Sequence, residues 1–426
     1  MGPTTCGAAF RHGSEKPMTG GASRTRRRSR GTQPSAFVTY GWCRTAYTVV
    51  RSLGSKGIEV HVGDASGSAM ARFSRFARSF TRLPDFFAEP DAYLDAVAVA
   101  LRRTGARVLF PCHEDVELVI RGRGRLPADL MLAVPTLERW GTAEDKLLCA
   151  RHAERAGCPT PPTYEVRSLD ELRTLGRELA YPLVIKTRIG NSAKGVRIAR
   201  SYDDLLTRFE QLVRSFDLTE DRLPVLQAFV DGPKLGVLGV YDRGKHVSSI
   251  VFDIVRSKGA ANFGTSTYRV TVDDPVTQRN AIAMMESLDW HGVVDMDWLR
   301  GSDGVASLID VNGRLGGATA LTMVAGMDLP YAWYRVATGT AHGAEAPTRV
   351  GAKARWILGD TLGLLDSARQ GRLRECVAGL RPQWRCGYDD LVWHDPVPFV
   401  AQGIDYLRKF AAAGGSSNPI TKGMIR

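Results

Sequence analysis

Short apolar runs alternate with amphipathic stretches between residues 36 and 135. Three runs have the composition of strands, Ala36–Tyr40, Ile58–Val62 and Arg107–Pro111. Between them, the spacing of apolar residues predicts helices over Ala46–Leu53 and Asp91–Thr104. This strand–helix–strand–helix–strand rhythm is typical of an open parallel sheet with helices on its faces. We therefore predict an N-terminal α/β domain over residues 36–135.

The ends of these predicted strands are where ligands bind in α/β folds. The glycines after the first strand do not form a G-x-G-x-x-G sequence, so a dinucleotide site is not supported. His113, Glu114 and Asp115 follow the third strand at its C-terminal end. Two roles remain open for them, contact with a substrate or an acidic cap on the next helix.

The pattern changes character after residue 136. Thr142 or Asp145 can cap a helix that continues through Lys146, and an extended, proline-rich segment begins near residue 157. Beyond residue 181 the apolar runs predict an antiparallel sheet, with a small-residue loop after its first strand. The runs are Leu183–Lys186, Val225–Val230, Gly236–Tyr241 and Val247–Phe252, and the loop is Gly190–Val196. Residues 346–426 contain helical stretches, Arg355–Arg369 and Val400–Phe410, which predict a small C-terminal lobe.

Two further apolar runs, Val293–Leu299 and Val305–Val311, flank the turn signal Gly301–Gly304 and predict a hairpin. Side chains alternate faces along a strand, so Asp295 and Asp297 share one face.

By the same rule Leu308, Asp310 and Asn312 share a face of the returning strand. We expect Asp297 to lie opposite or nearly opposite Asp310 and Asn312. Carboxylates in such apolar strands cost free energy unless something compensates them. Their hard oxygens suit Mg²⁺, and Arg314 adds a planar donor for a phosphate or carboxylate. The alternative is a solvated acidic face beside a turn.

Composition limits the class of protein. The chain has 426 residues, 44% hydrophobic and 24% charged, which are the fractions of a globular protein with two or three domains. No run approaches the roughly 18 apolar residues that a membrane span requires. The seven cysteines form no CxxC pair, so we expect no zinc site or disulfide framework, and a cytoplasmic location.

The net charge of +12 suggests nucleic-acid binding until it is located along the chain. Residues 1–35 hold seven Lys/Arg and one acidic residue, or +6 of the total, in a segment rich in glycine and serine. Such a segment is expected to be a disordered basic arm rather than a secretory signal. We therefore do not expect nucleic acid to be the main partner.

Together the motifs contain the ingredients of a nucleoside triphosphate site. Lys186 ends a strand four residues before a loop whose N–H groups can hold phosphate oxygens, and Lys146 adds a second cation. A third strand offers Gln227 and an apolar edge at Phe229 and Val230, which is suited to a flat adenine ring. No G-x-x-x-x-G-K-[ST] sequence is present, so the commonest class of nucleotide hydrolase is excluded.

This arrangement resembles the ATP-grasp superfamily of carboxylate–amine ligases, from about Ala36 to about Gly326. The family's last metal strand often has the sequence Glu-x-Asn-x-Arg, and here it is Asp310-Val311-Asn312-Gly313-Arg314. The resemblance implies an N-terminal α/β domain, then an ATP-grasp fold of two α+β subdomains over residues 136–345, with a lid near 181–235. The C-terminal lobe follows at residues 346–426.

The resemblance also implies roles for individual residues. Lys146 and Lys186 would hold the phosphates and the edge of the adenine, under a closing loop of Gly190, Asn191, Ser192, Ala193 and Gly195. Gln227, Ala228 and Val230 would line the adenine pocket. Asp297, Asp310 and Asn312 would hold one or two Mg²⁺ ions, while Arg314 stabilises the transferring phosphoryl group.

Two positions depart from the family pattern. Lys234 stands where a glutamate often contacts the ribose hydroxyls, and Ala228 stands where a charged or polar residue is common. Arg256 precedes a glycine-rich stretch like the substrate-facing segment of these ligases. It is expected either to bind a carboxylate or phosphate, or to be an exposed surface arginine.

The implied activity is ATP-dependent formation of an amide or peptide-like bond between a small carboxylic acid and an amine or amino acid, through an acyl phosphate. Two alternatives remain. The first is a carboxylase or carbamoyl-phosphate-type enzyme, although the chain has no Met-Lys-Met biotinyl segment and no glutaminase triad. The second is a non-catalytic nucleotide-binding protein. No membrane partner is expected, and a homodimer is common among relatives.

Overall fold

The computed structural model describes residues 33–190, 194–258, 264–341, 348–369, 371, 379 and 385–412. The predicted basic arm up to residue 32 lies outside the described residues, as do Asn191, Ser192 and Ala193 of the predicted loop. Within the described part of the chain, none of the helices combines the length and the apolar character needed to cross a membrane.

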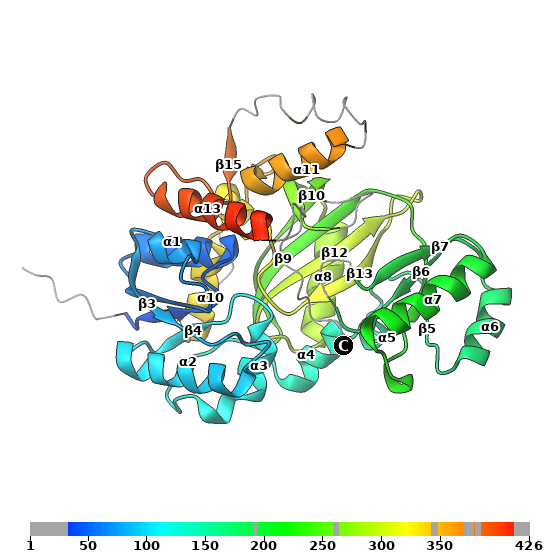
Figure 1. Ribbon diagram of the computed structural model, residues 1–426, viewed down its shortest axis with the longest axis horizontal. Helices are drawn as coiled ribbons and strands as arrows, with labels where there is room; N and C mark the ends of the chain where they lie inside the picture. Colours follow the sequence, from blue (N-terminus) through cyan, green and yellow to red (C-terminus); the bar gives the residue numbers. More distant parts are fainter. Residues whose placement is uncertain are drawn as a thin grey trace, which may run out of the picture. The chain divides into compact units, whose positions relative to one another are not determined.

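The N-terminal sheet is parallel throughout and has the strand order β3-β2-β1-β4. Its strands are β1 (Ala36–Val38), β2 (Val60–Asp64), β3 (Ala77–Arg82) and β4 (Val108–Phe110). Successive residues of β1 are buried on opposite faces, with Phe37 in one apolar cluster and Ala36 and Val38 in another. Helix α1 (Arg44–Ser55) covers one face and α2 (Pro90–Thr104) the other (Figure 1). The predicted parallel α/β domain is confirmed.

A large mixed sheet forms the centre of the chain, with the order β13-β12-β9-β10-β11-β14-β15. It is antiparallel except for the last pair, and α8 (Pro275–Ser287) packs against it. Its strands are β9 (Lys234–Asp242), β10 (Lys245–Ser257), β11 (Ser266–Val272), β12 (Gly292–Arg300), β13 (Ala306–Asn312), β14 (Lys353–Arg355) and β15 (Cys386–Tyr388). The hairpins predicted for β9–β10 and β12–β13 are both present.

A third, antiparallel sheet has the order β5-β8-β6-β7 and is covered by α6 (Leu169–Glu178) and α7 (Tyr202–Phe216) (Figure 1). Its strands are β5 (Thr163–Tyr164), β6 (Leu183–Lys186), β7 (Val196–Ala199) and β8 (Val225–Ala228). Both helices begin at a serine whose side chain accepts a hydrogen bond from a backbone N–H group of the first turn. Helices α4 (Leu137–Glu144) and α5 (Lys146–Arg155) precede this sheet and meet at Asp145.

The first sheet and the large sheet share one apolar core. Helices α9 (Thr319–Ala325) and α10 (Leu329–Ala337) follow β13 along the chain. The rings of Phe110 and Trp333 pack edge to face, with 4.7 Å between their centroids. The same buried cluster includes Leu238 of β9 and Ile250 of β10. The shared core fixes the end of β4 relative to the strands that follow it.

The C-terminal residues join structures formed earlier in the chain. Strands β14 and β15 extend the large sheet, and α11 (Ile357–Arg369) begins after β14. Helix α13 (Val397–Ala412) contacts the N-terminal domain, where Trp42 and Ser68 donate hydrogen bonds to the carboxylate of Asp405. The domain boundaries expected from the sequence stay predictions.

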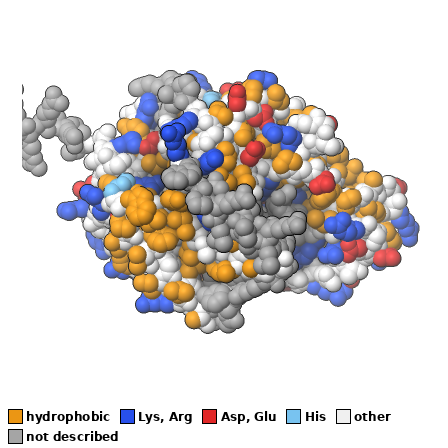
Figure 2. Space-filling view, turned by 90° about the horizontal axis from the view of Figure 1, so that it is seen from above, with side chains coloured by type: hydrophobic (Ala, Val, Ile, Leu, Met, Phe, Trp, Pro, Cys, Tyr) orange, Lys and Arg blue, Asp and Glu red, His pale blue; other side chains and the backbone are white. Residues whose placement is uncertain are grey.

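The outer side of α13 carries an exposed apolar stripe. Val397, Val400, Ile404 and Leu407 are 46–70% exposed and recur every three or four residues, the spacing of one helix face. Figure 2 shows hydrophobic side chains gathered on the left of this view, on the side where Figure 1 has α13. The stripe is therefore a surface feature separate from the buried core.

Candidate functional site

The acidic residues of the β12–β13 hairpin face one another. Asp297 pairs in register with Asp310, and Asp295 pairs with Asn312. Because residues two apart on a strand share a face, β12 presents Asp295, Asp297 and Leu299 to the same side. All three line a cavity of about 510 Å³, a volume typical of small-ligand pockets. The predicted pairing of Asp297 with Asp310 is confirmed, and their use as metal ligands stays a prediction.

A β-bulge changes the face that Leu308 occupies. The register shifts between Asp297 and Trp298, which pair with Asp310 and Leu308, so Ile309 is an extra residue in β13. Leu308 is 2% exposed and belongs to the same apolar cluster as Val311. The expectation that Leu308 shares a face with Asp310 and Asn312 was wrong, because the extra residue reverses the strand's alternation.

The cavity brings together most of the residues predicted for the site. It lies among the third sheet, the large sheet and the start of α5. Of the predicted residues it is lined by Lys146, Lys186, Gly190, Gly195, Gln227, Ala228, Val230, Lys234, Asp297, Asp310, Asn312 and Arg314.

Arg256 is engaged elsewhere. Its guanidinium donates to both carboxylate oxygens of Asp360 in α11, at 2.9 and 2.6 Å. The same carboxylate accepts hydrogen bonds from Thr267 and pairs with Arg355. The structure therefore does not bring Arg256 to the cavity, and its predicted substrate contact stays a prediction.

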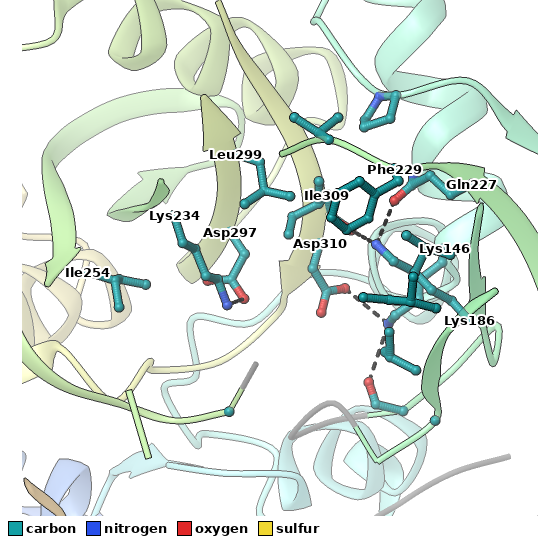
Figure 3. A pocket seen from close by; sticks show the side chains of 18 of the residues that line it. Lys146, Lys186, Gln227, Phe229, Lys234, Ile254, Asp297, Leu299, Ile309 and Asp310 are labelled. Atoms are coloured by element: carbon teal, nitrogen blue, oxygen red, sulfur yellow. Dashed lines mark hydrogen bonds and ion pairs between the residues drawn. The ribbon is translucent and has the colours of Figure 1, made fainter. Parts of the chain in front are cut away.

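Three lysines surround the two opposed aspartates (Figure 3). Lys146 Nζ lies 3.0 Å from Asp310 Oδ1 and donates to the carbonyl of Gly190 at 3.3 Å. Lys234 Nζ lies 2.7 Å from Asp297 Oδ2. Each of these aspartates is therefore paired with a lysine.

The position of Lys146 follows from the helix that it starts. Asp145 caps α5 by accepting hydrogen bonds from the N–H groups of Leu147 and Leu148, and its other oxygen pairs with Arg188 at 2.7 Å. Lys146 is thus the first residue of a helix whose end is held to the loop after β6. The side chain of Lys146 is therefore held between the start of α5 and the loop after β6.

Lys186 has no acidic partner in the described residues. Its ammonium donates to Gln227 Oε1 at 2.6 Å and to the carbonyl of Ile309 at 3.2 Å. Burial lowers the pKa of Lys186 to about 8, and the neighbouring charges of Lys146 and Lys234 act in the same direction. A buried ammonium held by neutral acceptors favours the arrival of an anion.

The end of the cavity near Lys186 is largely apolar. Phe229, Val184 and Ile309 line it beside Gln227, and Figure 3 shows Phe229 and Gln227 on the same side of the aspartates as Lys186. The side chain of Gln227 is also fixed by the hydrogen bond that its Nε2 donates to Thr163 Oγ1, at 2.8 Å. Apolar side chains with a few fixed polar groups are the arrangement that binds a planar heterocycle.

Arg314 is held by a residue of the N-terminal domain. Its Nε donates to Glu114 Oε1 at 2.8 Å and its Nη2 donates to Asn312 Oδ1 at 3.2 Å. Glu144 accepts a hydrogen bond from the N–H group of Gly313 at 2.7 Å. Burial, with the neighbouring charge of Glu114, raises the pKa of Glu144 to about 8.

The acidic loop after β4 has two separate roles. Glu114 contacts Arg314, whereas Asp115 is buried and accepts hydrogen bonds from Thr39 and Tyr93. His113 stacks on Tyr40 at 4.3 Å between ring centroids, and burial lowers its pKa to about 4. Glu114 was predicted only to contact a substrate or to cap the next helix, and Glu144 was not predicted as a site residue. Their partners, Arg314 and the N–H group of Gly313, are distant in sequence.

Asp295 also lines the cavity, and the sequence analysis did not assign it a role. The signal was present, because Asp295 and Asp297 were placed on one face. Its carboxylate lies against the backbone of Gly316, where an added Cβ would come within 2.2 Å of Asp295 Cγ and Oδ2. Burial, with the charge of Asp297, raises the pKa of Asp295 to about 7.

Comparison with known proteins identifies part of the chain. Residues 143–318 match the family model of the ATP-grasp domain. Among curated proteins, a biotin-dependent acyl-coenzyme A carboxylase alpha3 subunit of Mycobacterium leprae is 24% identical over 315 residues. That match covers 64% of this chain and 52% of the relative, so the chain spans about half of its length.

Solved structures share the fold at low sequence identity. The biotin carboxylase domain of Hydrogenobacter thermophilus 2-oxoglutarate carboxylase, in complex with MgADP and bicarbonate, has a TM-score of 0.61 and 15% identity, over 75% of this chain and 73% of that one. An L-amino acid ligase from Bacillus licheniformis has a TM-score of 0.57 and 16% identity, over 72% and 74%. The chain has the ATP-grasp fold that the sequence predicted.

Because Gly316 lies so close to Asp295, any side chain at position 316 is predicted to destabilise the fold. We expect Gly316→Ala to lower the free energy of unfolding by about 1–3 kcal/mol, since the new methyl group must displace the carboxylate or the backbone. Chemical denaturation of wild type and variant measures this difference.

Gly141→Ala is the matched control. Gly141 lies within α4, and an added Cβ would meet no atom of the described part of the chain within 4 Å, so the substitution should be neutral or stabilising. Equal stability of the two variants would contradict the packing described for Asp295.

Proposed function

We propose that this chain, whose residues 143–318 match the ATP-grasp domain, is an ATP-dependent ligase that joins a small carboxylic acid to an amine through an acyl phosphate. The proposal rests on the charged groups of one cavity, where the carboxylates of Asp297 and Asp310 face each other and three lysines line the same cavity. Mg²⁺ usually binds to one or two carboxylates plus substrate phosphates, and lysines hold phosphates as point charges.

The cavity has donors for each part of Mg-ATP. Lys146, Lys186 and the loop from Gly190 to Gly195 would hold the phosphates, while Gln227, Ala228 and Val230 would line the adenine slot. Lys234 stands at the expected ribose position, and its partner there is Asp297.

The carboxylate oxygens of Asp297 and Asp310 and the amide oxygen of Asn312 are hard donors that fit Mg²⁺. One or two Mg²⁺ ions held by these residues would neutralise the charge of the phosphates. In the structure the ammonium groups of Lys146 and Lys234 neutralise the carboxylates of Asp310 and Asp297. Binding of Mg-ATP would therefore release Lys146 from Asp310 to a phosphate oxygen.

The proposed reaction has two steps. A carboxylate oxygen of the acid attacks the γ-phosphorus of ATP, so that an acyl phosphate and ADP form. The amine nitrogen then attacks the acyl carbon, the C–N bond forms and the C–O bond to phosphate breaks. A protonated amine loses two protons, of which one leaves with hydrogen phosphate and the other passes to solvent.

Arg314 is the residue best suited to the charge that develops in these steps. Its bonds to Glu114 and Asn312 fix the plane of the guanidinium beside the aspartate pair. A preorganised donor of this kind stabilises negative charge without reorganising during the reaction. Catalysis by position and charge also agrees with a site that needs no covalent nucleophile.

A second candidate function is supported by the curated relatives, which include carboxylase subunits. In that case bicarbonate would take the place of the organic acid. The acid, the amine, a cytoplasmic location and a homodimer all remain proposals for this chain.

A substrate screen separates the candidates. Purified protein with ATP and Mg²⁺ is expected to release phosphate and ADP only when a carboxylic acid and an amine are both present. The measurement is coupled phosphate release from pools of organic acids and amino acids. Stimulation by bicarbonate alone would support the carboxylase, and ATP binding without turnover would support a non-catalytic protein.

Replacing one of the opposed aspartates tests the proposed metal site. We expect Asp310→Ala to reduce turnover by at least about a hundredfold, because it removes a ligand and leaves Lys146 without its partner. Circular dichroism and thermal unfolding check that the variant folds.

Asp170→Asn is the matched control, since this carboxylate is 91% exposed in its ion pair with Arg173 on α6. Near-normal turnover of Asp310→Ala would remove the metal assignment, whereas the control should retain full activity.

The lowered pKa of Lys186 predicts a pH dependence of ATP binding. Phosphate binding favours the ammonium form, so affinity is fully present below pH 8 and is lost as the pH rises through the pKa of about 8. The loss should approach about tenfold per pH unit for a single proton.

Calorimetric titration of wild type and Lys186→Met with Mg-ATP from pH 7 to pH 9.5 measures this. The variant should bind more weakly and with a flatter pH profile. Identical slopes for the two proteins would mean that Lys186 does not hold the nucleotide.

A further inference from the structure

We infer that Asp295 forms a subsite for the amine substrate and binds it as its ammonium cation. This inference rests on the proposed function and adds the charge class of the second substrate. It concerns the end of the cavity away from Phe229 and Gln227, which the ATP contacts proposed above do not use.

The carboxylate of Asp295 differs from its two neighbours on the cavity wall. Asp297 is paired with Lys234 and Asp310 with Lys146. Within the residues that the structure describes, no hydrogen bond or ion pair reaches the side chain of Asp295, although its backbone carbonyl accepts one from Asn312. One wall of the site therefore carries a carboxyl group without a contacting partner among the described residues, and an ammonium group placed there would favour its ionised form.

The nearest cations are already engaged. Arg314 directs Nε to Glu114, Nη2 to Asn312 and Nη1 to the carbonyl of Leu315. Lys234 is held by Asp297. Neither side chain can neutralise Asp295 by direct contact without giving up bonds that it makes in this structure.

The surrounding charge also favours a cation at this end. Glu114, Glu144 and Asp295 all act on the single guanidinium of Arg314, which makes direct contact with Glu114 but not with Asp295. Partly buried carboxylates attract opposite charge more strongly than exposed ones, because solvent screens them less. A bicarbonate or carboxylate ion would be repelled from Asp295, whereas an ammonium group would supply the missing partner.

The position suits an acceptor substrate. Asp295 lies two residues from Asp297 on the same strand face, and the cavity continues past it to Ile254 and Thr265. Figure 3 shows Ile254 on the opposite side of Asp297 from Lys186 and Gln227. An amine held by Asp295 would therefore approach the reacting phosphate from the side opposite the adenine slot.

The rigid backing of Asp295 fixes where that charge lies. The carboxylate is packed against Gly316, with no room for a Cβ atom. Glycine at this position allows the carboxylate to lie directly on the backbone of the loop after Arg314. The subsite is thus built by the same loop that carries the phosphoryl-stabilising arginine.

The test uses Asp295→Asn, which keeps the shape of the side chain and removes its charge. Two nucleophiles are compared in the presence of ATP, Mg²⁺ and a pool of organic acids. Amino acids carry an ammonium group, whereas hydroxylamine is largely uncharged at neutral pH and traps an acyl phosphate as the hydroxamate. Asp273→Asn, an exposed position between β11 and α8, is the control.

We expect Asp295→Asn to form hydroxamate at the wild-type rate and to raise the KM for the amino acid about 10- to 100-fold, the loss typical of one charge-assisted hydrogen bond. The control should match wild type with both nucleophiles. An unchanged KM for the amino acid would overturn the ammonium subsite.

An equal loss with both nucleophiles would also overturn it, since Asp295 would then act on the acid or on the metal. Absence of hydroxamate in the wild type, by contrast, would overturn the proposed ligase itself. The unfolding midpoint of Asp295→Asn, expected at or above that of wild type, shows that the variant folds.

Discussion

The site depends on the charge balance between two aspartates that face each other across adjacent antiparallel strands and the lysines that surround them. Asp297 and Asp310 are in register on β12 and β13, each with a lysine within 3.0 Å. Two carboxylates so close inside a sheet are costly unless cations compensate them. The lysines come from separate parts of the chain, Lys146 from the start of α5 and Lys234 from the start of β9. The charge balance therefore links the third sheet, the large sheet and the connecting helix around one cavity.

The N-terminal domain is part of the same electrostatic unit. Glu114 follows β4 and binds Arg314, which is 200 residues away in sequence. The apolar core around Phe110 and Trp333 fixes the end of β4 relative to β9 and β10. Packing far from the cavity thus decides where the guanidinium lies, so the parallel domain positions a residue that the proposed phosphoryl transfer uses.

Much of the fold was readable from local patterns, and the exceptions have physical causes. The Leu183–Lys186 strand and both hairpins follow from continuous apolar runs. Strand β3 (Ala77–Arg82) was missed, because an edge strand half-exposed along its length has no apolar run. The bulge at Ile309 was missed, because period-two alternation assumes that no residue is inserted.

The site was predictable where its chemistry is carried by residue type and order, as for Asp297, Asp310 and Lys186. The contacts around the site were not, because Glu114 meets Arg314, Glu144 meets Gly313 and Lys234 meets Asp297 only through the tertiary structure. Asp295 is an intermediate case. Its face was predicted correctly, but only the structure reveals that Asp297 and Asp310 are paired and that Asp295 has no contacting partner among the described residues.

The central claim is that the cavity is a magnesium–nucleoside triphosphate site, and calorimetric titration of the wild-type protein with ATP tests it most directly. We expect saturable binding at one site in the presence of Mg²⁺, and binding weakened at least about tenfold when EDTA removes the metal. Equal affinity with and without Mg²⁺, or no binding in either case, would contradict it.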